Sequence, residues 1–309
     1  TSKKHVNRAI AAVLFCAFVD AINIQCTAPN YPSMVTVGGH PDSFPNTDPL
    51  DFATAQYMLY GASKFGAFIS NLAAGTMSDR YGRRRMLMID LAGSVIFTLV
   101  KYFARHSYWF FVAMTFVNGL FGSSASVSVG YMADIFCDDR VKSDTYMNHV
   151  IAVALLGRAL GGLLTVMFPD DLFLPLIPAT VITCLGLVIA FKFVLEPRGL
   201  REKQAQERKD TSDGRQEKIQ QNAPPEKMEN KALFNIIIGA VIDNAGSVGI
   251  VPLALSPLMF DVFHNDIVEQ GLEPIMKEQT YRWLYSMIAL VVIPGAIAAP
   301  ICYRKLGIA

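Results

Sequence analysis

Long apolar stretches, separated by polar connections, dominate the chain from end to end. A helix needs roughly 20 consecutive apolar residues to cross the hydrocarbon core of a bilayer, and eight stretches reach that length. Backbone groups in lipid must satisfy their own hydrogen bonds, so we expect each stretch to be a helix. The pattern predicts an all-α integral membrane protein. The expected spans are residues 9–34, 52–77, 86–103, 109–136, 148–168, 172–195, 233–263 and 283–303.

One long polar segment interrupts this rhythm between the sixth and seventh spans. Charged residues and glutamines crowd together between Glu196 and Lys231, where Pro224 and Pro225 would interrupt any helix. This composition is typical of a solvated linker. The sequence therefore divides into a six-helix transmembrane bundle over 1–195, a charged linker over 196–232 and two further membrane helices over 233–309.

Basic residues gather in alternate connections, and this sets the expected orientation. Short cytoplasmic loops are enriched in Lys and Arg. The N-terminal segment and the second, fourth and sixth connections carry several, whereas the first and fifth connections carry none and the third carries only Arg105. We therefore expect a multi-pass protein with a cytoplasmic N-terminus; the sequence does not specify which membrane. The basic residues outside the linker on this side include Lys3, Lys4, Arg8, Arg80, Arg83, Arg84, Arg85, Arg140, Lys142, Arg304 and Lys305.

Composition narrows the functional classes. Hydrophobic residues make up 52% of the chain and charged residues only 17%, so lipid is the expected solvent for most of it. A formal net charge of +1 gives no reason to expect nucleic acid as a partner. The cysteines form neither a CxxC pair nor a Cys/His cluster, so no metal is expected. Without a phosphate loop or a nucleophile–base set, we predict that the protein is not an enzyme and uses no cofactor.

The connection between the second and third spans carries the most specific motif, Gly75-Thr-Met-Ser-Asp79-Arg80-Tyr-Gly82-Arg83-Arg84-Arg85. Its glycines permit a tight turn, and Asp79 can pair with basic groups. The motif resembles the loop signature G-x-x-x-D-R-x-G-R-R of the major facilitator superfamily at every defining position. The resemblance implies a transporter with two six-helix halves. On that plan the chain holds a complete N-terminal half and the first two helices of the C-terminal half. We expect it to be truncated after the eighth span, with missing C-terminal helices or a partner subunit completing it.

Two weaker matches resemble the tetracycline-efflux-like drug:proton antiporters within this superfamily. Asp20, Pro29 and Pro32 follow the pattern D-x8-P-x2-P of the first helix. Residues 157–162 resemble the antiporter signature G-P-x-x-G-G, except that Arg158 replaces the proline. From spacing alone, the glycines at the ends of Gly157-x-x-x-Gly161 are interpreted as helix-packing positions.

Polar side chains within the spans are candidates for a transport site. A charge at mid-membrane costs roughly 2.5–3.5 kcal/mol on insertion scales, so it must face a partner or a cavity. We interpret these residues as lining a central water-accessible cavity; the alternative is structural ion pairing of Asp20 with Arg158 or Lys64. Asp90 and Asp134 are expected nearer the cytoplasmic ends of their spans. The proton-carrier candidates are Asp20 and Asp243, and the substrate-cavity candidates are Asn23, Gln56, Tyr60, Lys64, Asn118, Arg158 and Asn244.

The resemblance also assigns roles to the loop and marks one departure. Asp134 is similar to the acidic position that pairs with the loop arginines, so Asp79, Arg83 and Asp134 are expected to form a cytoplasmic contact that stabilises one transport state. Asn118 stands where many members of the superfamily have an arginine. The loop-motif residues are Gly75, Asp79, Arg80, Gly82, Arg83 and Arg84, together with Asp134.

Three functions are compatible with these patterns. The leading hypothesis is proton-coupled export of a small organic solute by alternating access. The second is facilitated diffusion or symport of an anionic nutrient, for which Lys64 and Arg158 would supply positive charge. The third is a non-transporting accessory membrane subunit that retains part of the fold.

Overall fold

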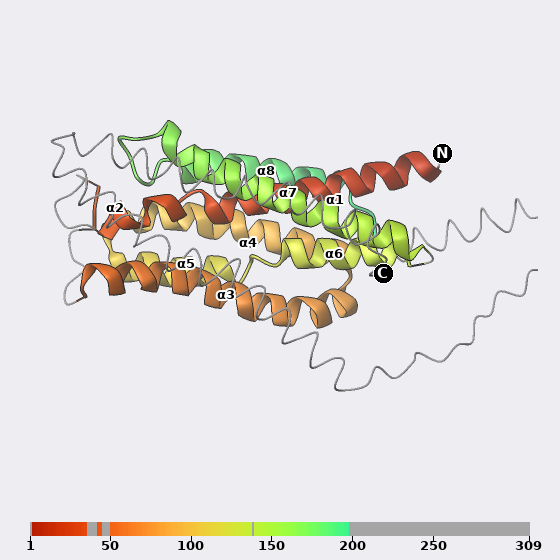
Figure 1. Cartoon of the computed structure of the whole chain (residues 1–309), viewed down its shortest axis with the longest axis horizontal. Helices are drawn as coiled ribbons and strands as arrows, with labels where there is room; N and C mark the ends of the chain where they lie inside the picture. Colours follow the sequence, from red (N-terminus) through yellow and green to blue (C-terminus); the bar gives the residue numbers. More distant parts are fainter. Residues whose placement is uncertain (1, 36–41, 45–49, 138, 198–309) are drawn as a thin grey trace, which may run out of the picture.

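The computed structural model describes residues 2–35, 42–44, 50–137 and 139–197. All regular structure in these ranges is helical, and the long helices lie side by side along one axis (Figure 1). The two expected spans after the linker, and the linker itself beyond Pro197, lie outside the described residues. The elements are α1 (Ser2–Gln25), η1 (Ala28–Asn30), α2 (Tyr31–Val35), α3 (Phe52–Tyr81), α4 (Arg83–Phe103), η2 (Ala104–His106), α5 (Tyr108–Gly119), α6 (Ser124–Ile135), α7 (Arg140–Met167) and α8 (Leu176–Phe193).

Five helical segments in the described part of the chain are long and apolar enough to cross a membrane. They correspond to the expected first, third, fourth, fifth and sixth spans. The expected second span is α3, which is long enough at 30 residues but carries Gln56, Lys64 and Asn71 along its length. The prediction of an all-helical membrane protein is confirmed. The five segments are His5–Val35, Arg83–His106, Tyr108–Ile135, Val141–Met167 and Leu176–Phe193.

Two of these spans are not the continuous helices that the apolar pattern suggests. The first breaks after Gln25, just before a single 3-10 turn that contains Pro29. Proline lacks an amide hydrogen and disfavours helix in the residue before it, which explains the break. The fourth breaks between Gly119 and Ser124, where glycine and serine are poor helix formers. In Figure 1, α5 and α6 follow one another along one line.

Small residues bring α1 and α7 into close contact. A Cβ atom placed on Gly161 would lie 2.5 Å from the backbone oxygen of Ile22, and one on Gly157 would overlap the oxygen of Phe18. Phe18 and Ile22 are one helical turn apart, as are the two glycines, so the two backbones run past one another without side chains between them. The structure therefore gives the Gly157-x-x-x-Gly161 spacing the packing role expected from the sequence.

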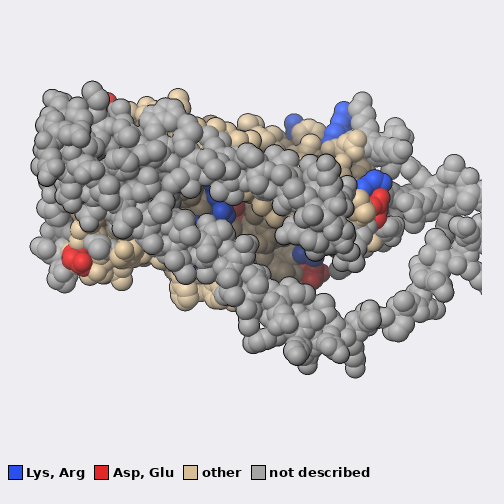
Figure 2. Space-filling view, in the orientation of Figure 1, with Lys and Arg blue, Asp and Glu red and all other residues tan. Residues whose placement is uncertain are grey.

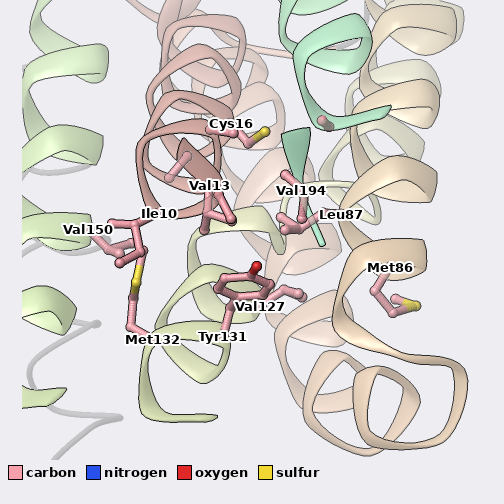
Figure 3. Close-up of a cluster of buried hydrophobic side chains, with 14 of the residues drawn as sticks. Ile10, Val13, Cys16, Met86, Leu87, Val127, Tyr131, Met132, Val150 and Val194 are labelled. Carbon is pink, nitrogen blue, oxygen red and sulfur yellow. The ribbon is translucent and has the colours of Figure 1, made fainter. Parts of the chain in front are cut away.

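Apolar side chains fill the bundle in two clusters, one near each end. The end at which α3 passes into α4, called here the motif end, has a cluster formed by α1, α3, α4, α6, α7, α8 and the chain after α8. Figure 3 shows Val13, Leu87, Val127 and Tyr131 within it. The Tyr131 hydroxyl donates to the backbone oxygen of Leu195 at 2.7 Å, which joins the chain after α8 to α6. A second cluster, which includes Phe44, Tyr108, Phe111 and Phe173, fills the opposite end.

Outward-facing residues of α8 show what surrounds the bundle. Val181, Leu185 and Val188 recur at helical spacing and are exposed, whereas Thr180 and Thr183 of the same helix are buried. Apolar side chains outside and hydroxyl groups inside are the reverse of the distribution in a water-soluble helix. The exposed stripe fits a helix in contact with lipid.

Candidate functional site

The loop motif folds around the guanidinium group of Arg83. Its Nη2 atom lies 2.6 Å from the Asp79 carboxylate on α3, and its Nε atom lies 3.0 Å from the Asp134 carboxylate on α6. Arg83 also donates to the hydroxyl of Ser78. Gly130 leaves room for the guanidinium, because a Cβ atom there would lie 2.9 Å from its Nη1 atom. This set, called here the Arg83 cluster, joins three helices at the motif end.

A carboxylate that the sequence analysis placed in the linker completes the motif end. Glu196 accepts hydrogen bonds from the backbone amides of Arg83 and Arg84, at 3.1 and 3.3 Å. These amides open α4, so the carboxylate satisfies donors that have no partner within the helix and lies at its positive end. Arg84 in turn donates to the backbone oxygen of Phe191 on α8 at 2.8 Å. Gly75 and Arg80 of the motif are exposed, and the backbone oxygen of Gly75 accepts a hydrogen bond from Ser78 at 3.0 Å.

A layer of hydrogen-bonded polar side chains crosses the interior between the two apolar clusters. Asn23 on α1 is fully buried and is its centre. Its amide donates to Thr183 on α8 at 3.1 Å, and its oxygen accepts from Thr98 on α4 at 2.6 Å. The Thr98 hydroxyl also lies 3.5 Å from the amide oxygen of Asn118 on α5. The structure therefore brings together two of the cavity candidates, Asn23 and Asn118, through a threonine.

Asp20 lies one turn along α1 from Asn23 and is only 2% exposed. Its carboxylate accepts a hydrogen bond from Ser94 on α4 at 3.1 Å. The positive charge of Arg158 on α7 acts on Asp20 and also on Lys64, which is half-buried on α3. Three of the predicted ionisable residues thus belong to one electrostatic group inside the bundle.

Two further candidates on α3 lie apart from that group. Tyr60 donates to the backbone oxygen of Ala28 at 2.8 Å and packs edge-on against the ring of Tyr31, with ring centroids 4.9 Å apart. Gln56, one turn before Tyr60, is also buried. These contacts hold α3 against the turn after α1. The remaining candidates, Asp243 and Asn244, lie outside the described residues, and the transport roles of all these residues stay predictions.

A polar stripe on α4 escaped the sequence analysis. Asp90, Ser94, Thr98 and Lys101 are all buried and recur every three or four residues, the spacing of one helix face. Asp90, which is expected near the cytoplasmic end of its span, is only 2% exposed and accepts a hydrogen bond from Ser123 at 3.0 Å. The signal was present in the periodicity of this span. Serine and threonine in an apolar helix are weak indicators of a polar contact with another helix, because their hydroxyls can bond to the backbone of their own helix.

Comparison with known proteins supplies the family context for this geometry. A family model described as Major Facilitator Superfamily matches residues 13–309. The chain is 27% identical over 185 residues to the Tetracycline resistance protein, class C, of Escherichia coli, a match that covers 59% of this chain and 44% of that protein. It is 30% identical over 149 residues to the Hippocampus abundant transcript-like protein 1 of Homo sapiens, covering 47% of this chain and 28% of that protein. These matches span less than half the length of either relative.

A solved structure shows the same arrangement of helices. The D-xylose-proton symporter superposes with a TM-score of 0.67 over 97% of this chain and 70% of that one, at 14% sequence identity. At this identity, the likeness concerns the fold alone.

Proposed function

The chain belongs to the Major Facilitator Superfamily, and from that premise we propose that it exports a small organic solute by alternating access in exchange for protons. Its family and its all-helical membrane fold confirm the predictions made from the loop motif and the apolar pattern, including the prediction that the protein is not an enzyme. Membership by itself leaves the substrate, the direction and the coupling ion open. The proposal for these rests on the buried residues.

The carboxylate of Asp20 is the observation that carries the proposal. It lies in the first span at 2% exposure, within the electrostatic influence of Arg158 and held by Ser94. An intramembrane carboxylate is costly when charged and is characteristic of proton pathways. If its proton exchanges with each side in turn, the change of charge can alter its attraction to Arg158 and so couple proton movement to helix movement. The similarity to two tetracycline resistance proteins supports export as the direction.

The Arg83 cluster supports the alternating-access part of the proposal. It joins α3, α4 and α6 through one guanidinium group, and Glu196 adds the chain after α8. Ion pairs of this kind can be formed in one state of a transporter and broken in another. We propose that the cluster lies on the cytoplasmic side, with the N-terminus, and that it stabilises the state closed to the cytoplasm.

Transport by the full-length protein in proteoliposomes tests the proton coupling. We expect candidate solutes to be moved against their gradient only when a pH gradient is imposed. Asp20→Asn removes the titratable group at nearly constant size, so it should abolish gradient-driven transport while solute binding persists. Asp144→Asn, at an exposed position on α7, is the matched control and should behave like the wild type. Equal rates with and without the pH gradient would contradict the proposal.

Uptake of an anionic nutrient is the second candidate function, and Lys64 favours it. Two basic side chains, Lys64 and Arg158, act on one another inside the bundle, and an anion between them would relieve their repulsion. Lys64→Ala and Arg158→Ala should then abolish the binding of anionic solutes selectively, whereas Lys192→Ala, at an exposed position on α8, should not. Indifference of anion binding to both inner substitutions would remove this candidate.

A further inference from the structure

Lys101 is a buried basic residue that the proposed function does not use. It lies in the last turn of α4, within the third span, and is only 2% exposed. Among the described residues, no carboxylate forms an ion pair with its ammonium group, and the thiol of Cys26, directly after α1, is the one ionisable group that acts on it. A basic side chain inside a membrane bundle is costly without a partner and is characteristic of a substrate or ion pathway.

The hydrogen bonds of the polar layer show which residues lie at the level of Lys101. The spans that contain α1 and α4 are the first and third, so they cross the membrane in the same direction, and Asn23 of α1 accepts from Thr98 of α4 at 2.6 Å. Three residues further along each span, close to one helical turn, lie Cys26 and Lys101. The electrostatic interaction between these two side chains agrees with this register. Lys101 therefore lies one turn beyond the polar layer, beside the break in the first span.

A buried hydroxyl group on α5 belongs to the same level. The helices α4 and α5 form an antiparallel hairpin, in which the Thr98 hydroxyl lies 3.5 Å from the amide oxygen of Asn118. Three residues after Thr98 on α4 and three residues before Asn118 on α5, the hairpin brings Lys101 opposite Thr115. Thr115 is 2% exposed, and its Oγ1 atom has no hydrogen-bond partner among the described residues. The hairpin therefore places an unused hydroxyl group at the level of the ammonium group.

A second such hydroxyl comes from the break in the first span. Thr27 follows Cys26 directly and is fully buried, and its Oγ1 atom also has no hydrogen-bond partner in the described part of the chain. The second apolar cluster reaches this level, since it includes Cys26 and Ala104. Buried polar groups are almost always hydrogen-bonded, and a ligand can supply the missing partner. An ammonium group and two unused hydroxyl groups thus lie at one level, where a low dielectric strengthens their attraction for an anion.

We propose that Lys101, Thr27 and Thr115 bind one small monovalent anion, either a chloride ion or the carboxylate group of a solute. The ammonium group can only donate hydrogen bonds and each hydroxyl has one proton to donate, so a ligand that only accepts satisfies all three. One ammonium group balances one negative charge. Lys64 and Arg158 act on one another on α3 and α7 and form a separate basic pair. Transport of the bound anion rests on the proposed function, whereas its binding at Lys101 does not.

Anion binding to the purified full-length protein in lipid nanodiscs tests the inference. One arm measures saturable binding of radioactive chloride, and the other measures saturable binding of radioactive benzoate in chloride-free buffer; methanesulfonate keeps the ionic strength constant in both. We expect the wild type to bind in at least one arm. Benzoate binding would identify a site for carboxylates, and chloride binding without benzoate binding would identify a site for the inorganic ion.

Substitutions at the site should weaken this binding. Lys101→Met removes the charge at similar size, so we expect an affinity lower by about tenfold or more, the usual effect of losing a charged hydrogen-bond donor. Thr115→Val removes one neutral donor at constant shape and should have a smaller effect in the same direction. Lys192→Met, at an exposed position on α8, is the matched control and should bind like the wild type.

Melting of the same variants separates loss of the site from loss of the fold. The bound anion should raise the melting temperature of the wild type but not that of Lys101→Met, which should melt no lower than the wild type when neither anion is present. A wild type that binds neither anion would overturn the inference, and so would a Lys101→Met protein with wild-type affinity. If Lys101→Met does not fold, unchanged affinity in the double variant Thr27→Val and Thr115→Val would overturn it instead.

Transport measurements distinguish this inference from the proposed function. If a pH gradient drives solute transport but the protein binds neither anion, the inference fails and the proposed function stands. If anion binding depends on Lys101 but no pH gradient drives transport, the proposed coupling fails and the anion site stands.

Discussion

At the scale of single residues, Gly82 determines how the loop motif turns. It separates α3 from α4 and has φ = 94° and ψ = 143°, a conformation that side chains other than hydrogen strongly disfavour. A Cβ atom there would also lie 2.8 Å from the Glu196 carboxylate, which caps α4 through the amides of Arg83 and Arg84. Two separate constraints therefore require glycine at this position.

Substitution of Gly82 by alanine should be costly for both reasons. We expect Gly82→Ala to reduce the free energy of unfolding by about 1–3 kcal/mol, the usual cost of a residue forced into such a backbone conformation. Melting of the purified protein in nanodiscs measures the effect. Gly75→Ala is the matched control, because its Cβ atom would meet nothing within 4 Å and its position is helical. Equal melting temperatures for the two variants would contradict this account of the turn.

At the scale of helices, α1 packs centrally among the other helices for two reasons: its neighbours have small residues where they contact it, and its own polar face bonds to them. Gly157 and Gly161 let α7 approach the backbone of α1, and Gly186 of α8 leaves room for the side chain of Val19. The polar residues Asp20 and Asn23 are buried there and bond to side chains of α4 and α8. Close packing and the polar layer therefore depend on one another.

Widening the contact between α1 and α7 tests that dependence. Gly161→Val places methyl groups where the Ile22 backbone oxygen lies 2.5 Å from the Cβ position, so it should destabilise the protein by about 1–3 kcal/mol or more. Gly61→Val on α3 meets no atom within 4 Å and is the matched control for the change in helix propensity. Heat-induced unfolding in nanodiscs should separate the two variants; identical curves would refute the close contact.

At the scale of the whole molecule, charge is distributed unevenly along the bundle axis. Figure 2 shows basic and acidic side chains together towards the motif end, and acidic ones at the opposite end of the visible face. The N-terminus of α1, the Arg83 cluster and Lys142 belong to the motif end, whereas Ser107 lies between η2 and α5 at the other end. This asymmetry favours a cytoplasmic location for the motif end.

Labelling of single cysteines in sealed vesicles of known orientation measures the topology. With the other four cysteines replaced by serine, the exposed Cys137 should react with a membrane-impermeant maleimide from the cytoplasmic side only. A cysteine introduced by Ser107→Cys into a background without the other five should react only from the opposite side. Reaction of both positions from the same side would contradict the arrangement of α5 and α6 as one broken span, and exchange of the two sides would contradict the proposed orientation.

The apolar pattern and the motif were sufficient to predict most helices, because the conditions for crossing a lipid bilayer apply to each segment separately. Each segment had to provide its own length of apolar residues and satisfy its own backbone, and those properties are visible in any window of the sequence. The motif also indicated that Arg83 would meet Asp79 and Asp134. Breaks at Pro29 and at Gly119 were harder to foresee, since such residues are tolerated in many membrane helices when neighbours satisfy the freed backbone groups.

The sequence by itself determined the solvent, the helices and the family, while only the tertiary structure decided which buried polar groups meet. Asn23 bonds to Thr183, 160 residues away, and Glu196 caps a helix that begins more than a hundred residues earlier. The rotation of a helix about its own axis is set by the small residues and polar partners of its neighbours, and apolar content alone does not encode it. For the same reason, Asp90 was visible as a charge in the third span, but its hydrogen bond with Ser123 of the next span was not.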